Sequence, residues 1–134
     1  MKAAITFLIL TCCLTTARAA DSVPIDVFTD STAYRLVNAE GAAVYDLSAP
    51  QRLLDGISQG LPKNPETAKA IATGRFNAGR PSLAAAFGGH ALAMRYGIAK
   101  IPAIVFNHGE AVAYGLTDVA QAASLYRQWR QGER

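Results

Sequence analysis

The sequence predicts an α/β domain with a four-stranded mixed sheet flanked by helices. Three observations lead to this prediction. Short apolar runs typical of strands lie at 23–29, 42–47, 101–106 and 111–114. Apolar residues recur every three or four positions between 48 and 96 and again after 117, which indicates amphipathic helices. The order along the chain is therefore strand, strand, helices, strand, strand, helix.

The first two strands are separated by a short connection. Residues 23–29 alternate apolar and polar side chains, with Pro24 near the start, where an edge position tolerates a proline. Asp30-Ser31-Thr32 then predicts a turn or a helix cap. Residues 33–41 show no clear pattern and are few for a crossover helix. The second strand is expected at 42–47.

Three helices are expected in the middle of the chain. Ser48 is predicted to cap the first, with Gln51 reaching back to its backbone. Asn64-Pro65 opens a second helix over about 66–77, and Gly79-Arg80-Pro81 separates it from a third that starts at Ser82. The expected core side chains of these helices are Leu53, Leu54, Ile57, Ala68, Ile71, Ala72, Phe76, Leu83, Ala86, Phe87, Ala91 and Met94.

The last third of the chain predicts a hairpin and a closing helix. Gly97 ends the preceding helix, and Pro102 stands at the start of the next strand. Asn107-His108-Gly109 predicts the turn that leads into the strand at 111–114. Thr117 is expected to cap the final helix, with Asp118 favourable at its N-terminus. The apolar stripe of this helix consists of Val119, Ala122, Ala123, Tyr126 and Trp129.

The N-terminus has the pattern of a secretory signal peptide. Lys2 is followed by an apolar stretch, and Ala17-Arg18-Ala19 matches a signal-peptidase site. We expect cleavage after Ala19, a mature domain of residues 20–134 and a periplasmic location. Cys12 and Cys13 are the only cysteines, so the mature domain would contain no thiol. Lipidation at one of them is the alternative, disfavoured because Thr11 precedes Cys12 where a small residue is usual.

The composition excludes several classes of function. The chain has 13 basic and 10 acidic residues, and loss of Lys2 and Arg18 leaves 11 basic residues and a net charge of +1. No basic run indicates nucleic-acid binding. His90 and His108 lie on different predicted elements without a cluster of ligands, so we expect no metal and no cofactor.

The order of elements and Pro102 together are typical of a thioredoxin-like fold. Such folds place a cis-proline at the start of their third strand, facing the loop after the first strand, and we predict a cis Ile101–Pro102 bond. The position of the redox cysteines corresponds here to Thr29-Asp30-Ser31-Thr32. Without a thiolate, thiol–disulfide exchange is excluded, although the scaffold can still bind an extended chain.

Four stretches also resemble a family of small exported proteins encoded within integrating conjugative elements. They are residues 27–29, Leu61-Pro62, residues 96–106 and residues 112–119, followed by Tyr126 and Trp129. The Gly-Ile-x-x-x-Pro-Ala pattern from Gly97 is similar to periplasmic pilus-assembly proteins of conjugation systems. The resemblance implies a periplasmic accessory of a type IV secretion apparatus, with no catalytic residues.

The sequence therefore predicts a non-catalytic protein that works by contact with other proteins of the transfer apparatus. It would make no direct contact with nucleic acid and have no stable membrane insertion after cleavage. The candidate interaction residues are Phe28, Thr29, Asp30, Ser31, Ile101, Pro102 and Tyr114. Two alternatives stay open at this point. One is a holdase that binds unfolded segments, and the other is a hydrolase or isomerase using Asp30 with Ser31 or a histidine, with Asp46 and Asp118 as further carboxylates near strand ends.

Overall fold

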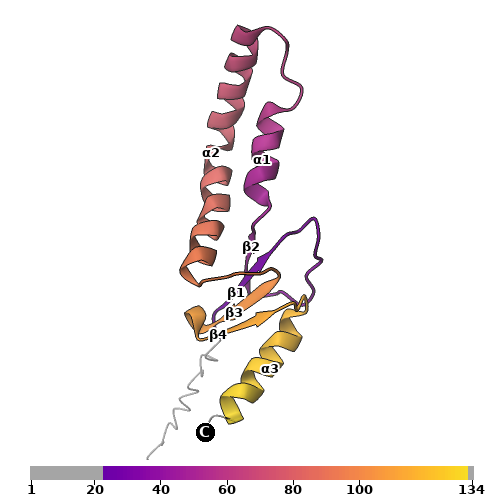
Figure 1. Cartoon of the computed structure of the whole chain (residues 1–134), viewed down its shortest axis with the longest axis vertical. Helices are drawn as coiled ribbons and strands as arrows, with labels where there is room; N and C mark the ends of the chain where they lie inside the picture. Colours follow the sequence, from indigo (N-terminus) through magenta and orange to yellow (C-terminus); the bar gives the residue numbers. More distant parts are fainter. Residues whose placement is uncertain (1–22, 133–134) are drawn as a thin grey trace, which may run out of the picture.

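A computed structural model describes residues 23–132 as one sheet with helices on both faces (Figure 1). The expected signal peptide of residues 1–19, its cleavage site, Cys12 and Cys13 lie outside the described residues. Among residues 23–132, no helix combines the length and the apolar character that a membrane span requires.

The sheet contains four strands, β1 (Ile25–Thr29), β2 (Ala43–Asp46), β3 (Ala103–Phe106) and β4 (Ala111–Tyr114). Their order across the sheet is β2-β1-β3-β4. β1 and β2 are parallel, whereas β3 runs antiparallel to both of its neighbours. The predicted α/β class and four-stranded mixed sheet are confirmed. A short 3-10 turn, η1 (Asn107–Gly109), joins β3 to β4 where the sequence predicts a turn.

Three helices complete the fold, α1 (Ala49–Ser58), α2 (Pro65–Arg95) and α3 (Val119–Gly132). The prediction of separate helices at 66–77 and 82–96 is wrong, because α2 continues through Pro81. Contacts on both sides of this proline hold α2 in place. Before it, Arg75 donates hydrogen bonds to the carbonyl oxygens at the end of α1, and after it, His90 Nε2 lies 2.8 Å from the Leu47 carbonyl oxygen. This support offsets the cost of a proline inside a helix.

The two faces of the sheet form two separate cores. Alternation along the strands directs Val27, Ile104 and Phe106 toward α3, where Val119, Ala122 and Tyr126 cover them. The intervening strand residues are directed toward the C-terminal part of α2, and this second core consists of Phe28, Ala93, Ala103 and Val105, with Tyr45 and Tyr96 beside it. The sheet is therefore buried on both faces.

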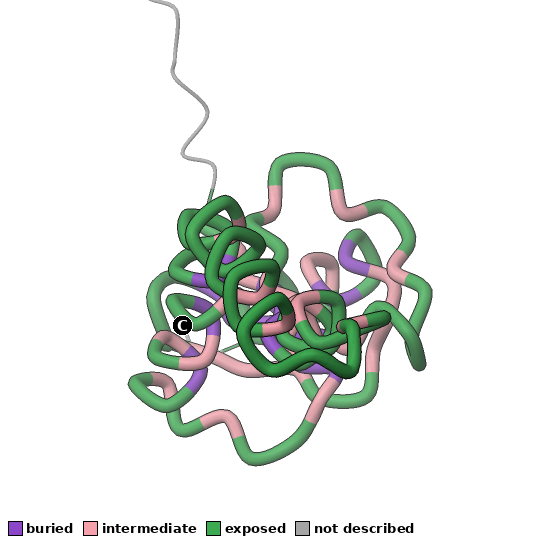
Figure 2. The backbone as a smooth tube through the Cα atoms, turned by 90° about the horizontal axis from the view of Figure 1, so that it is seen from above, coloured by how far each residue is buried: buried purple, intermediate pink, exposed green. Residues whose placement is uncertain are grey.

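α1 and the N-terminal half of α2 form a helical hairpin that stands away from the sheet (Figure 1). No residue between 51 and 82 is buried, and the corresponding turns in Figure 2 are mostly exposed. Several residues predicted to lie in the core are exposed, both in this hairpin and farther along α2, where Met94 reaches 81% exposure. Spacing along a helix identifies its apolar positions, but no other described segment covers these side chains enough to bury them. The exposed members are Leu54, Ile71, Phe76, Phe87, Ala91 and Met94.

Two predicted helix caps differ in the structure. Ser48 precedes α1, but its side chain makes no capping hydrogen bond, and Gln51 bonds to Asp55. At the start of α3, the cap is Asp118 rather than Thr117, because Asp118 accepts a hydrogen bond from the Gln121 N–H. The Ser48 hydroxyl instead donates a hydrogen bond to Asp46.

The connection between β1 and β2 contains no helix. Its only strand-like contact among the described residues is an isolated bridge between Val37 and Asp118, reinforced by a hydrogen bond from the Asn38 side chain to Asp118. This connection passes along the α3 side of the sheet, where Leu36 and Ala39 pack against the core.

Candidate functional site

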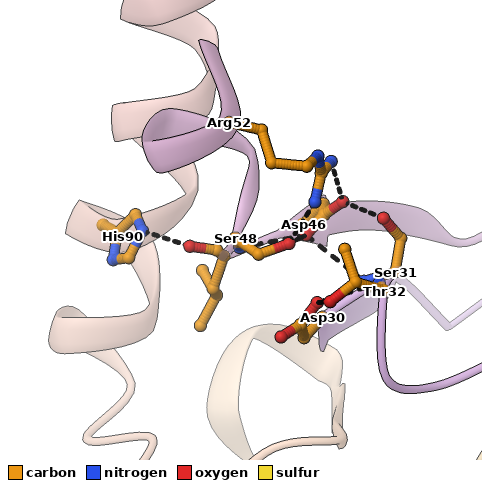
Figure 3. A network of polar contacts seen from close by, with 8 residues as sticks. Asp30, Ser31, Thr32, Asp46, Ser48, Arg52 and His90 are labelled. Carbon is orange, nitrogen blue, oxygen red and sulfur yellow. Dashed lines mark hydrogen bonds and ion pairs between the residues drawn. The ribbon is translucent and has the colours of Figure 1, made fainter. Parts of the chain in front are cut away.

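A cluster of polar side chains lies at the carboxyl ends of the parallel strands β1 and β2 (Figure 3). β1 ends in the Asp30-Ser31-Thr32 loop, and β2 ends at Asp46 immediately before α1. Because parallel strands bring their carboxyl ends to one edge of the sheet, the loop and the start of α1 meet there. The edge of an α/β sheet at this position is a common place for a functional site.

Asp46 is the centre of this cluster. Its Oδ1 accepts hydrogen bonds from the Ser48 N–H at 3.0 Å and the Ser48 hydroxyl at 2.7 Å. Its Oδ2 accepts from the Ser31 hydroxyl and from Arg52 Nη2, the latter at 2.7 Å. Arg52 also donates to the Ser48 hydroxyl. The carboxylate thus ties the loop after β1 to the first turn of α1.

These contacts determine the charge state of Asp46. Partial burial by itself would raise the pKa of the carboxyl group. The hydrogen bonds from Arg52, Ser31 and Ser48 outweigh this effect and hold the pKa well below its ordinary value. A carboxylate with so little affinity for a proton is a weak general base at neutral pH, and both of its oxygens are already engaged.

Asp30 forms a local turn. Its Oδ1 accepts hydrogen bonds from the Thr32 hydroxyl at 2.6 Å and from the Thr32 N–H at 2.9 Å. These bonds, with a smaller contribution from the Ser48 hydroxyl, lower the pKa of Asp30. The side chain therefore stabilises the loop in the manner of an Asx turn.

The geometry gives little support to the catalytic alternatives. The Ser31 hydroxyl donates to Asp46, and His90 is engaged with a backbone carbonyl rather than with a hydroxyl. Asp118 bonds to Asn38 and to the N-terminus of α3 and makes no bond to Asp30 or Asp46 within the described chain. Between residues 23 and 132, no three His, Cys, Asp or Glu side chains are placed to hold a metal ion.

The predicted interaction residues gather at this end of the sheet, but several are buried. Phe28, Thr29 and Pro102 are buried, so their side chains contribute little to the contact surface that the sequence predicts. The Thr29 hydroxyl has no hydrogen-bond partner within the described residues. The Ile101–Pro102 peptide bond is cis, as predicted.

Accessible groups remain beside these buried residues. Ser31 is exposed, and Asp30 and Ile101 are half-buried. The register pairs Phe28 with Ala103 and Ala103 with Tyr114, so Tyr114 lies at the same end of the sheet and is 45% exposed. The Pro102 carbonyl oxygen accepts a hydrogen bond from Gly115. Ile101 itself makes no backbone hydrogen bond to any described residue.

The roles of Ser48 and Arg52 were not expected from the sequence. Asp46 is followed by Ser48 two residues later, a spacing at which an aspartate often bonds to the following backbone. Arg52 lies four residues after Ser48, one turn along α1. These spacings are a local signal for the cluster, but the bond to Ser31 depends on the pairing of β1 with β2.

Comparison with known proteins identifies the family of the chain. No curated protein and no solved structure matches this chain. One family model matches residues 22–132, which is most of the sequence. The chain therefore belongs to the family described as "Protein of unknown function (DUF1525)".

Proposed function

We propose that this protein is an exported, thioredoxin-like module that works by protein contact in the periplasmic part of a conjugative type IV secretion apparatus. The sheet order β2-β1-β3-β4, the helices on both faces and the proline before β3 support the thioredoxin-like assignment. The resemblance of residues 96–106 and 112–119 to exported proteins of conjugative elements supports the setting. The signal-peptide pattern supports the periplasmic location.

The main chain around Ile101 is the observation on which the contact role depends. Continuing the β1–β3 register by two residues places Asp30 opposite Ile101. No backbone hydrogen bond joins them, and neither residue donates its N–H to another backbone group in the described chain. Unpaired main-chain groups at a sheet end can receive an extended segment of a partner. We therefore assign the contact surface to Asp30, Ser31, Ile101 and the exposed Tyr114.

The polar cluster supports a structural role for the loop in this surface. Hydroxyls stand at the positions where thioredoxins have thiols, and those of Ser31 and Thr32 are held by Asp46 and Asp30. The loop is thus preorganised by its own side chains, which reduces the entropy lost when a partner binds.

Single-cysteine cross-linking tests this role in cells that conjugate. Residues 20–134 contain no cysteine, so Lys100→Cys places one exposed thiol next to Ile101, and Gln128→Cys places a control thiol on α3. We expect a thiol-specific cross-linker to join Lys100→Cys to one protein of the transfer apparatus, and Gln128→Cys to give no such adduct. Deletion of the gene should lower the conjugation frequency.

Three other outcomes would contradict the proposal. Unchanged conjugation together with no adduct would exclude a role in transfer. Adducts with many unrelated exported proteins would favour the holdase. Mass spectrometry of the exported protein should find Ala20 at the N-terminus, and an intact residue 1 would contradict cleavage.

A further inference from the structure

β4 is an edge strand that lacks the usual protection against pairing. It pairs only with β3, so its other side has no neighbour within the described residues. Natural edge strands are commonly protected by charged residues or proline. The β4 sequence Ala-Val-Ala-Tyr contains neither. Its outer edge is therefore open to another extended chain.

The hydrogen-bond pattern shows which main-chain groups point outward. Gly115 donates to the Pro102 carbonyl oxygen, so this pair is a hydrogen-bonded pair of the antiparallel ladder. Such pairs alternate, and the register then makes Ala113 and Ala111 the hydrogen-bonded partners of β3. The N–H and C=O groups of Val112 and Tyr114 consequently point away from the sheet.

An apolar cavity of about 400 Å³ lies beside this edge, between β4 and α3. On the sheet side, the small side chains of Ala111 and Ala113 leave the space open. On the helix side it is lined by Leu125 and Trp129, which are 49% and 41% exposed. Large apolar side chains on an added strand would fill the space that the alanines leave.

The wall of this cavity carries one charged residue among the described ones, and that charge is already paired. Glu110, the carboxylate in its wall, already accepts hydrogen bonds from Tyr126 and from Arg130. The charged residues of α3 as far as Gly132 are Arg127 and Arg130, and no described carboxylate forms an ion pair with Arg127. Both arginines line a second cavity on the other side of Tyr126, which no residue of β4 lines. The cavity beside β4 therefore favours an apolar partner segment over a charged one.

We propose that β4 and this cavity form a docking site for an extended segment of a partner protein, which adds to the sheet as a fifth strand. The segment would carry large apolar side chains at alternate positions, directed into the cavity. A groove between an edge strand and a helix is a recurring arrangement for strand addition. The site is separate from the surface around Ile101 and depends on the proposed function only in that the protein works by contact.

Selection from a phage-displayed library of random peptides tests the site without the transfer apparatus. The enriched peptides should alternate large apolar residues with others. On binding a synthetic peptide of this kind, the amide protons of Val112 and Tyr114 should become protected from exchange. Those of Ala111 and Ala113 should already be protected in the unbound protein.

Two pairs of variants separate the contribution of the β4 main chain to peptide binding from the contribution of the cavity. Val112→Pro removes an outward N–H without removing a β3–β4 hydrogen bond, and Val112→Thr keeps the N–H and the branched shape. Leu125→Asp places a charge in the cavity, whereas Gln128→Asp places it on exposed α3 surface outside the cavity. We expect Val112→Pro and Leu125→Asp each to weaken binding by about tenfold or more, and their controls by less than about threefold.

Other outcomes would overturn the proposal. Enriched peptides whose binding is indifferent to Val112→Pro and Leu125→Asp, with both variants folded by circular dichroism, would place binding elsewhere. Failure to enrich any peptide would exclude a strand-addition site of useful affinity. A dimer in solution that Val112→Pro converts to a monomer would show that a second copy, not a partner segment, occupies the edge. None of these results bears on conjugation, so the proposed function is tested separately.

Discussion

Replacement of Asp46 by alanine is expected to destabilise the fold without altering its core. The side chain accepts hydrogen bonds from Ser31, Ser48 and Arg52, and it joins the end of β2 to the loop after β1. Hydrogen bonds to a charged group contribute about 1.5–3 kcal/mol each when buried. Asp46 is 20% exposed and Arg52 is 44% exposed, so solvent weakens these bonds. We expect a total loss of about 2 kcal/mol.

The pH dependence distinguishes this network from a general packing defect. The pKa of Asp46 is lowered in the folded protein, so its stabilising effect is complete above the unfolded-state pKa of about 4 and is lost as the pH falls toward the lower folded value. The difference in unfolding free energy between wild type and Asp46→Ala should therefore be constant near neutral pH and should shrink below about pH 4.

Urea denaturation followed by circular dichroism measures both effects. Glu40→Ala is the matched control, because Glu40 is an exposed carboxylate that makes no side-chain hydrogen bond in residues 23–132. It should change the unfolding free energy by less than about 0.5 kcal/mol. A similarly small effect of Asp46→Ala, or a difference that is unchanged in acid, would refute the assignment of Asp46 as the centre of the cluster.

Three further comparisons test the packing. Gly88→Ala should stabilise α2 by up to about 1 kcal/mol, since nothing lies within 4 Å of the added Cβ. Gly89→Ala should destabilise the protein by about 1 kcal/mol, because its Cβ would lie 3.1 Å from a tyrosine of β2. Equal melting temperatures for the two variants would contradict this packing. Thr29→Val removes a buried hydroxyl that has no partner among the described residues, and equilibrium unfolding should show unchanged or increased stability, by up to about 1 kcal/mol. A loss above that amount would indicate that the hydroxyl has a partner. Ile104→Ala should cost about 2–5 kcal/mol in the same measurement, and Met94→Ala less than about 0.5 kcal/mol, although the sequence predicts Met94 as core. Equal losses would show that another segment covers Met94.

Much of the sheet was predictable because strand signals are local. The buried run from Ala103 to Phe106 identified β3, and the turn residues at 107–109 identified its hairpin partner. The cis bond before Pro102 was also expected from the order of the elements around it. The bounds of the strands differ only slightly from those predicted.

The helices were less predictable because burial depends on what lies opposite. Pro81 indicated a helix end, yet contacts of Arg75 and His90 on either side keep α2 continuous. Phe76 and Met94 have helical spacing typical of a core face. Phe76 is exposed because the hairpin of α1 and α2 extends beyond the sheet, whereas Met94 lies in the part of α2 that covers the sheet, where its neighbour Ala93 is buried instead.

Only some members of the polar cluster were predictable. Asp30, Ser31 and Asp46 were candidates because they stand at strand ends, but their partners depend on parallel pairing of β1 with β2. That pairing brings Ser31 to Asp46 across fifteen positions of the chain. Similarly, burial of Phe28, Thr29 and Pro102 follows from the sheet being covered on both faces.

The amino-acid sequence by itself determined the class of the fold, the order of its strands and helices, and the absence of a thiol from residues 20–134. These properties depend on residue types and short-range spacing. Only the tertiary structure decided which surfaces stay open: the main chain at Ile101, the outer edge of β4 and the exposed flank of α2. Exposure depends on whether a distant segment arrives to cover a group, and local patterns contain no information about that.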